Sequence, residues 1–392
     1  MATSEEKDDG FCSAINPFAL GEMVAGKKIN WSKEKDPDKK LAEILGIKSP
    51  KAIFDADSPI LFPKKLKYNA KTEKVKVVSA AKDLNRLQNF YKKNAVVVKK
   101  ALKTKSAKLT DASPSDLALS KVSSVLFPKL DTSNSKSSSV PTKWMVKGDF
   151  IVNNMIGEEV QQGALGDCYF LAALASVQWS RPSLLNYVKL SNGNYKFCFW
   201  TKKLKAEWVT VSQSVEVRKS DGAWLYGRSN TYNETWPALW EKAFAKWMSG
   251  TSSDHPDMQE IAGGKGDVAL RRLTGYEFDD YYCSSSNSSK IWRMLELRTD
   301  SSGKTIYPIA VNTSGVNRRD SIGTIPHHVY SVLGIEWYNG EKYIVVRNPW
   351  ASDEVKMYCR SGSWNGLSLN YNGVFSMKFD KFLEYFLYIY FV

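Results

Sequence analysis

The chain has 392 residues, of which 43% are hydrophobic and 12% aromatic, and its net charge is +14 at pH 7. This length allows two or three domains with sizeable cores. Its five cysteines, an odd number without a CxxC pair, argue against a disulfide framework or a zinc site. The longest apolar run is too short to span a bilayer, and the acidic first ten residues do not form a signal peptide. We therefore expect a soluble, cytoplasmic protein.

The basic character belongs to the front of the chain. Residues 1–143 hold 28 Lys and Arg against 16 Asp and Glu, whereas residues 144–392 hold 27 against 25. Such a region would suit an anionic membrane or a cytoskeletal partner, whereas nucleic acid is not expected. The alternative is a solvated, partly disordered extension. Its residues 80–103 carry apolar side chains at steps of three and four, which predicts a basic amphipathic helix. This helix either packs on the globular body, which we favour, or lies on a membrane.

A Ser-rich linker at residues 131–143 predicts a domain boundary near 143. Beyond it, Asp167 and Cys168 open a predicted helix that runs to about residue 177. Residues 235–249 predict a second helix, in which Thr235 can cap and a proline suits the first turn. Residues 327–350 form two β-branched and aromatic runs around Asn339-Gly340, a strong hairpin signal. Helices followed by antiparallel strands indicate an α+β fold.

Cys168 stands where a Gly-rich turn becomes an apolar helix. A helix N-terminus favours the thiolate, which is the nucleophilic form of cysteine. Most free cysteines are nevertheless small buried residues, and Cys168 alone would favour that interpretation. A nucleophile also needs a base and a group that orients the base.

The predicted hairpin supplies candidates for both. His327 and His328 begin its first strand, and Asn348 ends its second. A two-residue turn would place Asn348 on the face opposite to His328. A three-residue loop, or a bulge, would place the two side chains on one face, because a slip of one residue reverses the faces of a strand. The catalytic interpretation therefore requires the odd-length loop or the bulge.

Several separate blocks now support a family resemblance. In chain order they are "QGALGDCYFLAALAS", "WPALWEKAFAKW", the glycine pair 263–264, "HVYSVLGI", "VVRNPW" and "NGVFSMKFDKFLEYF". Their order and wording resemble the protease core of the calpain family over about residues 144–392, without the penta-EF-hand or C2-like domains. The resemblance implies a papain-like core with one lobe at 144–264, a second at 265–392, and a basic extension at 1–143.

The resemblance also implies roles for individual residues. Cys168 would be the nucleophile, His328 the base, Asn348 the residue that orients the base, and Gln162 the oxyanion donor. Trp350 would shield the histidine–asparagine contact from water. Gly263 and Gly264 would leave a bare backbone along which a substrate lies as an added strand, although without the resemblance a plain turn is an equal interpretation. His327 replaces a glycine that usually precedes the catalytic histidine, and we take His328 as the base.

Calcium is the cofactor that the resemblance implies, at two sites. Glu159 and Glu241 match acidic positions of the first site. Asp353 and Glu354 would belong to the second, but Asn372, Gly373 and Val374 stand where the family has two carboxylates, so we expect this site to be weakened or absent.

Three hypotheses result. The first is an intracellular cysteine endopeptidase that makes limited cuts in protein substrates. The second is an inactive module that binds cytoskeleton or membrane, which the presence of all four catalytic residues disfavours. The third makes residues 1–143 an autoinhibitory or processed pro-region.

Overall fold

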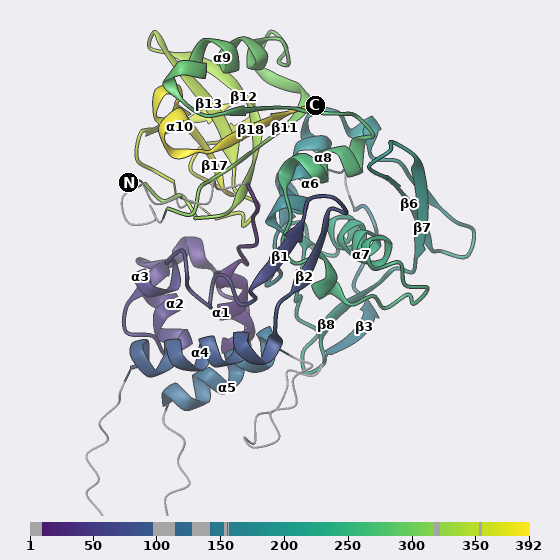
Figure 1. The fold of residues 1–392 in the computed structure, drawn as a ribbon, viewed down its shortest axis with the longest axis vertical. Helices are drawn as coiled ribbons and strands as arrows, with labels where there is room; N and C mark the ends of the chain where they lie inside the picture. Colours follow the sequence, from purple (N-terminus) through teal and green to yellow (C-terminus); the bar gives the residue numbers. More distant parts are fainter. Residues whose placement is uncertain are drawn as a thin grey trace, which may run out of the picture.

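The structure is a computed structural model that describes residues 10–96, 114–127, 142–152, 155, 157–316, 322–352 and 355–392. Helices and strands alternate along the chain, so the fold is mixed α and β (Figure 1). Among the described residues, no helix combines the length and the apolar character needed to cross a bilayer. None of the five cysteines, all of which lie in the described residues, forms a disulfide.

The front third contains a packed helical unit, whereas the sequence predicted an extension that is partly disordered or helical. Its elements are α1 (Pro17–Ala25), α2 (Pro37–Leu45), α3 (Pro50–Ile53), β1 (Leu66–Asn69), β2 (Lys74–Val77), α4 (Ala80–Asn94) and α5 (Pro114–Leu126). Short apolar clusters that look isolated in the sequence meet in one core, which includes Phe18, Leu41, Phe54, Leu61, Leu87 and Val122. The many lysines of this region lie mostly on the surface of the unit. A lysine-rich composition therefore did not reveal that the region contains a packed core.

The predicted amphipathic helix is present as α4 and packs on the body of the protein, as we favoured. Leu87 and Tyr91 are buried, and the Tyr91 hydroxyl donates a hydrogen bond to the Leu45 carbonyl at 2.8 Å. The helix ends at Asn94, and residues 97–103 of the predicted span lie outside the described residues.

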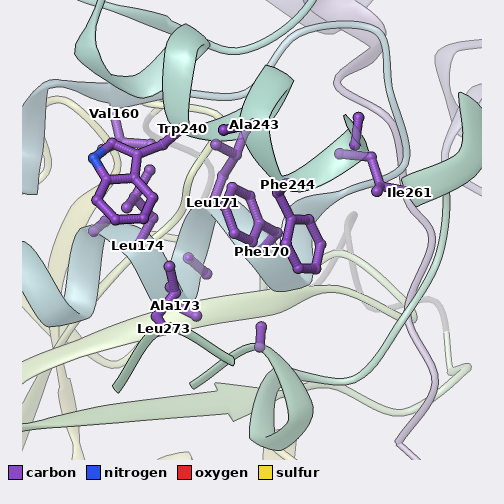
Figure 2. Close-up of a cluster of buried hydrophobic side chains, with 14 of the residues drawn as sticks. Val160, Phe170, Leu171, Ala173, Leu174, Trp240, Ala243, Phe244, Ile261 and Leu273 are labelled. Atoms are coloured by element: carbon purple, nitrogen blue, oxygen red, sulfur yellow. The ribbon is translucent and has the colours of Figure 1, made fainter. Parts of the chain in front are cut away.

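Three further helices, α6 (Cys168–Ser180), α7 (Trp236–Ser249) and α8 (Gly266–Thr274), share a second core. Helix α6 is buried on nearly all sides, which explains why its sequence is apolar all round. Phe170 of α6 stacks on Phe244 of α7 with ring centroids 4.2 Å apart (Figure 2). Both helices occupy the predicted positions. The Thr235 hydroxyl, however, donates to the Asp149 carbonyl and does not cap α7.

Short strands surround these helices. They are β3 (Thr142–Val146) paired with β8 (Ser214–Arg218), β4 (Val160–Gln161) with β9 (Arg228–Ser229), and the sheet of β5 (Tyr187–Lys189), β6 (Tyr195–Trp200) and β7 (Ala206–Val211). The domain boundary predicted at 264/265 falls before α8, yet Leu270 and Leu273 of α8 belong to the same core as α6. The position of this boundary stays a prediction.

A seven-stranded antiparallel sheet forms the remainder. In spatial order its strands are β10 (Asp279–Tyr282), β18 (Tyr388–Phe391), β11 (Lys304–Asn312), β12 (Val329–Tyr338), β13 (Glu341–Arg347), β17 (Val374–Lys378) and β14 (Cys359–Arg360). A third core includes side chains of this sheet and of α9 (Ser288–Glu296) and α10 (Phe379–Tyr385). A small hairpin of β15 (Ser363–Trp364) and β16 (Leu367–Ser368) adds a fourth cluster.

Helix α6 is fastened directly to this sheet. The Ser331 hydroxyl of β12 donates to the Ala172 carbonyl at 2.7 Å, and the Ser176 hydroxyl donates to the Ile309 carbonyl of β11 at 2.8 Å. Buried side-chain hydrogen bonds of this kind fix orientation because breaking them leaves polar groups without partners. They hold the start of α6 beside the start of β12.

Candidate active site

Cys168 is the first residue of α6 and is fully buried. Burial raises the pKa of its thiol to about 12, and the charge of Asp167 acts in the same direction. The nearby backbone groups of Val329, Ala14 and Tyr169 lower the pKa and partly oppose this rise. The thiol is therefore protonated in this state, although it occupies the predicted helix N-terminus.

His328 immediately precedes β12, and its neighbour Val329 is one of the groups that face the Cys168 sulfur. The ring Nε2 lies 2.8 Å from Asn348 Oδ1. The same oxygen accepts a hydrogen bond from the Trp350 backbone N–H at 3.0 Å. Because Oδ1 accepts from both groups, Nε2 carries the ring hydrogen and Nδ1 keeps its lone pair.

This lone pair remains available in the structure. Nδ1 of His328 is buried without a hydrogen-bond partner in the part of the chain that is described. No hydrogen bond joins the ring to the Cys168 sulfur in these described residues. Burial lowers the pKa of His328 to about 3, against a smaller rise caused by the hydrogen bond with Asn348. The ring is therefore neutral.

A β-bulge brings His328 and Asn348 to the same face. The hairpin closes with the two-residue turn between Tyr338 and Glu341, the option that by itself would separate the two side chains. The register then shifts, because Val332 pairs with Val346 whereas Gly334 pairs with Val345. The extra residue, Leu333, reverses the faces beyond it. The sequence analysis had offered two alternatives, a three-residue loop or a bulge, and the structure has the bulge.

Trp350 covers this pair. Its ring centroid lies 4.8 Å from that of His328, and its side chain is buried in the core of the N-terminal unit, where it contacts Phe18. Water is therefore excluded from that side of the imidazole.

Gln162 is fully buried. Its Nε2 donates to the Leu165 carbonyl at 2.6 Å and to the Ala14 carbonyl at 2.9 Å. The second contact is with a peptide carbonyl from a distant part of the chain. The predicted oxyanion donor therefore holds a main-chain oxygen.

The glycine pair holds the same distant segment. Gly264 exchanges two backbone hydrogen bonds with Cys12, at 2.8 and 2.9 Å. A Cβ at Gly264 would clash with the Tyr169 ring at 2.5 Å, and Gly263 has φ of 85°. Both positions therefore require glycine. Gly264 thus pairs with Cys12 through one antiparallel bridge, and a role of the glycine pair in substrate binding stays a prediction.

His327 occupies the position where the family has glycine. Its φ is 46°, in the left-handed region that glycine adopts most readily. Its ring meets Phe62 of the N-terminal unit edge-on, with centroids 5.8 Å apart. The bulky ring thus serves as a contact for that unit at the edge of the site.

Sequence reasoning missed residues 10–16, which lie across the predicted site. Nothing in "GFCSAIN" signals this, because the role of the segment depends on where the chain passes. The short run gave no helical or strand pattern of its own, and its partners are 148 and 252 positions away, at Gln162 and Gly264.

Comparison with known proteins supplies the family. Residues 120–391 match the model of the calpain family cysteine proteases. The chain belongs to this family. The family match covers the thiol, imidazole and amide side chains described above, and it begins within α5.

Three relatives illustrate the extent of the likeness. The chain is 26% identical to a thiol protease of Porphyromonas gingivalis, over 99% of this chain and 89% of the relative. It is 27% identical to human calpain-8, over 60% of this chain and 33% of the relative. It is 29% identical to the mouse calpain-1 catalytic subunit, over 63% and 35%. The chain thus spans about a third of the calpains, whereas it covers most of the bacterial relative, N-terminal unit included.

The carboxylates predicted for the first calcium site, Glu159 and Glu241, have different hydrogen-bond partners. Glu159 accepts a hydrogen bond from the Thr231 hydroxyl at 2.5 Å. Glu241 instead accepts from the Gly227 N–H at 2.9 Å and faces Asp167, the residue before the nucleophile. Burial raises the pKa of Asp167 to about 7 and that of Glu241 well above its usual range. Two neighbouring buried carboxyl groups resist ionising together.

The second predicted site is covered only in part. Asp353 and Glu354 lie outside the described residues. Asn372 donates to the Glu158 carbonyl at 2.8 Å and accepts from Asn230, so its side chain already has partners. Within the described residues, no group of three or more His, Cys, Asp or Glu side chains is arranged to hold a metal ion. The residues predicted for calcium stay a prediction, and no step below depends on the ion.

Proposed function

We propose that this protein is a cysteine endopeptidase in which Cys168 is the nucleophile, His328 the base and Asn348 the residue that orients the base. The observation that carries the proposal is the 2.8 Å contact between His328 Nε2, just before β12, and Asn348 Oδ1, just after β13. It leaves Nδ1 as the basic atom on a strand whose next residue, Val329, faces the sulfur.

The proposed reaction proceeds through a thioester. Nδ1 of His328 takes the thiol proton, and the sulfur attacks the carbonyl carbon of the peptide bond. The carbon–nitrogen bond then breaks, and the imidazolium gives its proton to the leaving amine. Water, deprotonated by the same ring, hydrolyses the thioester. Such proton transfer contributes about 10²–10⁴ in rate.

Gln162 would stabilise the charge that develops on the oxygen. Its Nε2 already donates to one peptide carbonyl, that of Ala14. Removal of one oxyanion donor typically lowers turnover by about 10²–10³. We also propose a two-lobed papain-like arrangement for the core, with the site between α6 and the β12–β13 hairpin.

Protein substrates, cut at a few positions in the cytoplasm, are part of the same proposal. Five unpaired thiols support a reducing compartment. A membrane or cytoskeletal partner for the basic front third stays a prediction, and calcium dependence is left to assay. An inactive binding module is not favoured, because thiol, imidazole and both amide side chains are all in place.

Hydrolysis of casein or a fluorogenic peptide, with and without calcium, tests the proposal. Cys168→Ala should abolish hydrolysis, whereas Cys283→Ala, the same change at another buried thiol, should leave it unchanged. A thiol-directed irreversible inhibitor should label Cys168 in the wild type. Hydrolysis that survives Cys168→Ala would remove this residue from the mechanism.

A further inference from the structure

We propose that residues 10–16 are a tethered peptide ligand of the substrate cleft, which a protein substrate must displace before it can be cut. The inference rests on the proposed function in that it takes the surface along Gly264, Cys168 and Gln162 as the cleft. In Figure 1 the start of the described chain passes beside the seven-stranded sheet before it reaches α1.

The segment binds as an added strand. Cys12 and Gly264 form an antiparallel bridge in which each N–H donates to the other residue's carbonyl. Strand addition of this kind is a general way to hold an extended peptide, because the main-chain hydrogen bonds do not depend on sequence. The edge that would receive a substrate is therefore already paired.

The next residues lie against the catalytic groups. The backbone of Ala14 lies near enough to the Cys168 sulfur to lower the pKa of the thiol, and its carbonyl accepts from Gln162 Nε2 at 2.9 Å. A Cβ at Gly166 would come within 2.5 Å of the Ser13 carbonyl oxygen, so that glycine admits the segment. A peptide backbone thus sits where the proposed nucleophile and oxyanion donor would meet a substrate.

Burial confirms that the space is filled. Cys12 and Ala14 are both 0% exposed, and Cys12 belongs to the core of α6 and α7. The cavity that remains beside Ser13 and Gly166 measures about 20 Å³, which is room for roughly one water molecule. A substrate strand therefore cannot enter while the segment is seated. The fully buried thiol and imidazole, both neutral, are consistent with a resting state.

The packed N-terminal unit holds the segment in place. The Asn16 N–H donates to the Gly163 carbonyl at 3.2 Å, and its side-chain amide donates to the Gln162 carbonyl at 2.9 Å. The Asn16 side-chain oxygen also caps α1, so the strand leads directly into the helix. Attachment to a folded unit gives the segment a high effective concentration, on the order of millimolar for short flexible tethers and higher for a fixed one.

Ion pairs at one place and a hydrogen bond at another dock that unit on the core. Glu73, at the β1–β2 turn, pairs with Arg271 and Arg272 of α8. Arg218 of β8 donates to the Met23 carbonyl at the end of α1 and pairs with Asp221. All three arginines are mostly buried. These contacts therefore oppose displacement of the segment from the cleft.

Variants at Cys12 test the proposal by activity. Cys12→Arg places a charge in an apolar core and should expel the segment. We expect kcat/KM for a fluorogenic peptide to rise at least tenfold. Glu43→Arg, which introduces the same side chain at an exposed position of α2 in the same unit, should leave kcat/KM unchanged. Equal rates for wild type and Cys12→Arg, with both folded by circular dichroism, would overturn the proposal.

A binding measurement separates this proposal from the proposed function. A fluorescein-labelled peptide with the sequence of residues 10–16 is titrated against Cys168→Ala and against the double variant Cys12→Arg with Cys168→Ala. We expect the double variant to bind at least tenfold more tightly. If no variant hydrolyses peptide but the double variant binds, the proposed activity fails and the tethered ligand stands. Equal binding of the peptide to the two proteins would contradict the proposal that residues 10–16 occupy the cleft, whatever the activity.

Hydrogen exchange on the wild-type protein requires no variant that must fold. The Cys12 and Gly264 amides should exchange slowly, because each is buried and hydrogen-bonded. Addition of a tight peptide inhibitor should speed exchange at Cys12 and keep Gly264 protected. Free exchange at both amides in the uninhibited protein would contradict a seated segment.

Discussion

The imidazole of His328 and the side-chain oxygen of Asn348 lie 2.8 Å apart because one extra residue, Leu333, bulges from β12. Without the bulge, the tight turn at Asn339-Gly340 would place the two side chains on opposite faces. The geometry of the proposed base is therefore decided five residues along the strand from His328.

Asn348→Ala should lower kcat by about 10²-fold, because a ring that is no longer oriented transfers protons poorly. KM should change little, since Asn348 is not proposed to touch the substrate. Steady-state kinetics on a fluorogenic peptide measure both constants, with Asn192→Ala at an exposed turn as the control. A fall confined to KM would contradict the orienting role.

Gly334→Ala should destabilise the protein by about 1–3 kcal/mol, the usual cost of overpacking. A Cβ there would lie 2.2 Å from the Gly303 carbonyl oxygen and 2.5 Å from the Trp364 ring. The Gly303 backbone cannot move away as a flexible side chain could. The bulge at Leu333, beside the new methyl group, should therefore distort. Urea unfolding measures the loss. An unchanged midpoint would show that this part of β12 adapts freely.

Acid should weaken the fold through His328. Its pKa is about 3 in the native protein, against an ordinary value of 6.5. Between these values the unfolded chain binds the proton and the native ring does not, so the free energy of unfolding falls as pH falls from 6.5 towards 3. The slope is at most about 1.4 kcal/mol per pH unit. Urea unfolding of wild type and His328→Gln should show this slope in the wild type alone.

The Asp167–Glu241 pair should act in the opposite direction. The pKa of Asp167 is about 7, above its ordinary value of 3.8, so the native state holds a proton that the unfolded chain releases. Its stabilising contribution is complete below about pH 4 and is lost as pH rises through about 7. Glu241→Gln should reduce this dependence, because a neutral amide can donate to an ionised Asp167. The difference in unfolding free energy between wild type and variant, at pH 5 and 7.5, cancels the effect of His328.

Glu73→Ala should destabilise the protein by roughly 3–5 kcal/mol, the cost of leaving buried charges unpaired. Arg271 and Arg272 would both lose their carboxylate partner. Glu43→Ala, at an exposed position, should stay within about 0.5 kcal/mol of the wild type. Urea unfolding compares the three proteins. A loss no larger than that of the control would show that the docking pair adds nothing to stability.

The local elements, and the reactive side chains that they carry, could be predicted from the order of the residues alone. Apolar periodicity and helix-start signals placed α6 and α7, and Asn339-Gly340 placed the turn of the β12–β13 hairpin, because these features depend on neighbours a few residues apart. Residue identity alone also named a thiol, an imidazole and two amides in the order of a known protease core.

Which of these side chains lie close together could be seen only in the folded chain. Gly334, a glycine inside the strand, signals a bulge nearby but does not say which residue is the extra one. Glu241 faces Asp167 because helix packing, not spacing, sets its neighbour. The path of residues 10–16 past Gly264 and Gln162 could likewise not be predicted from the sequence. Contacts between segments more than a hundred residues apart arise from the burial of whole elements, and no local pattern records them.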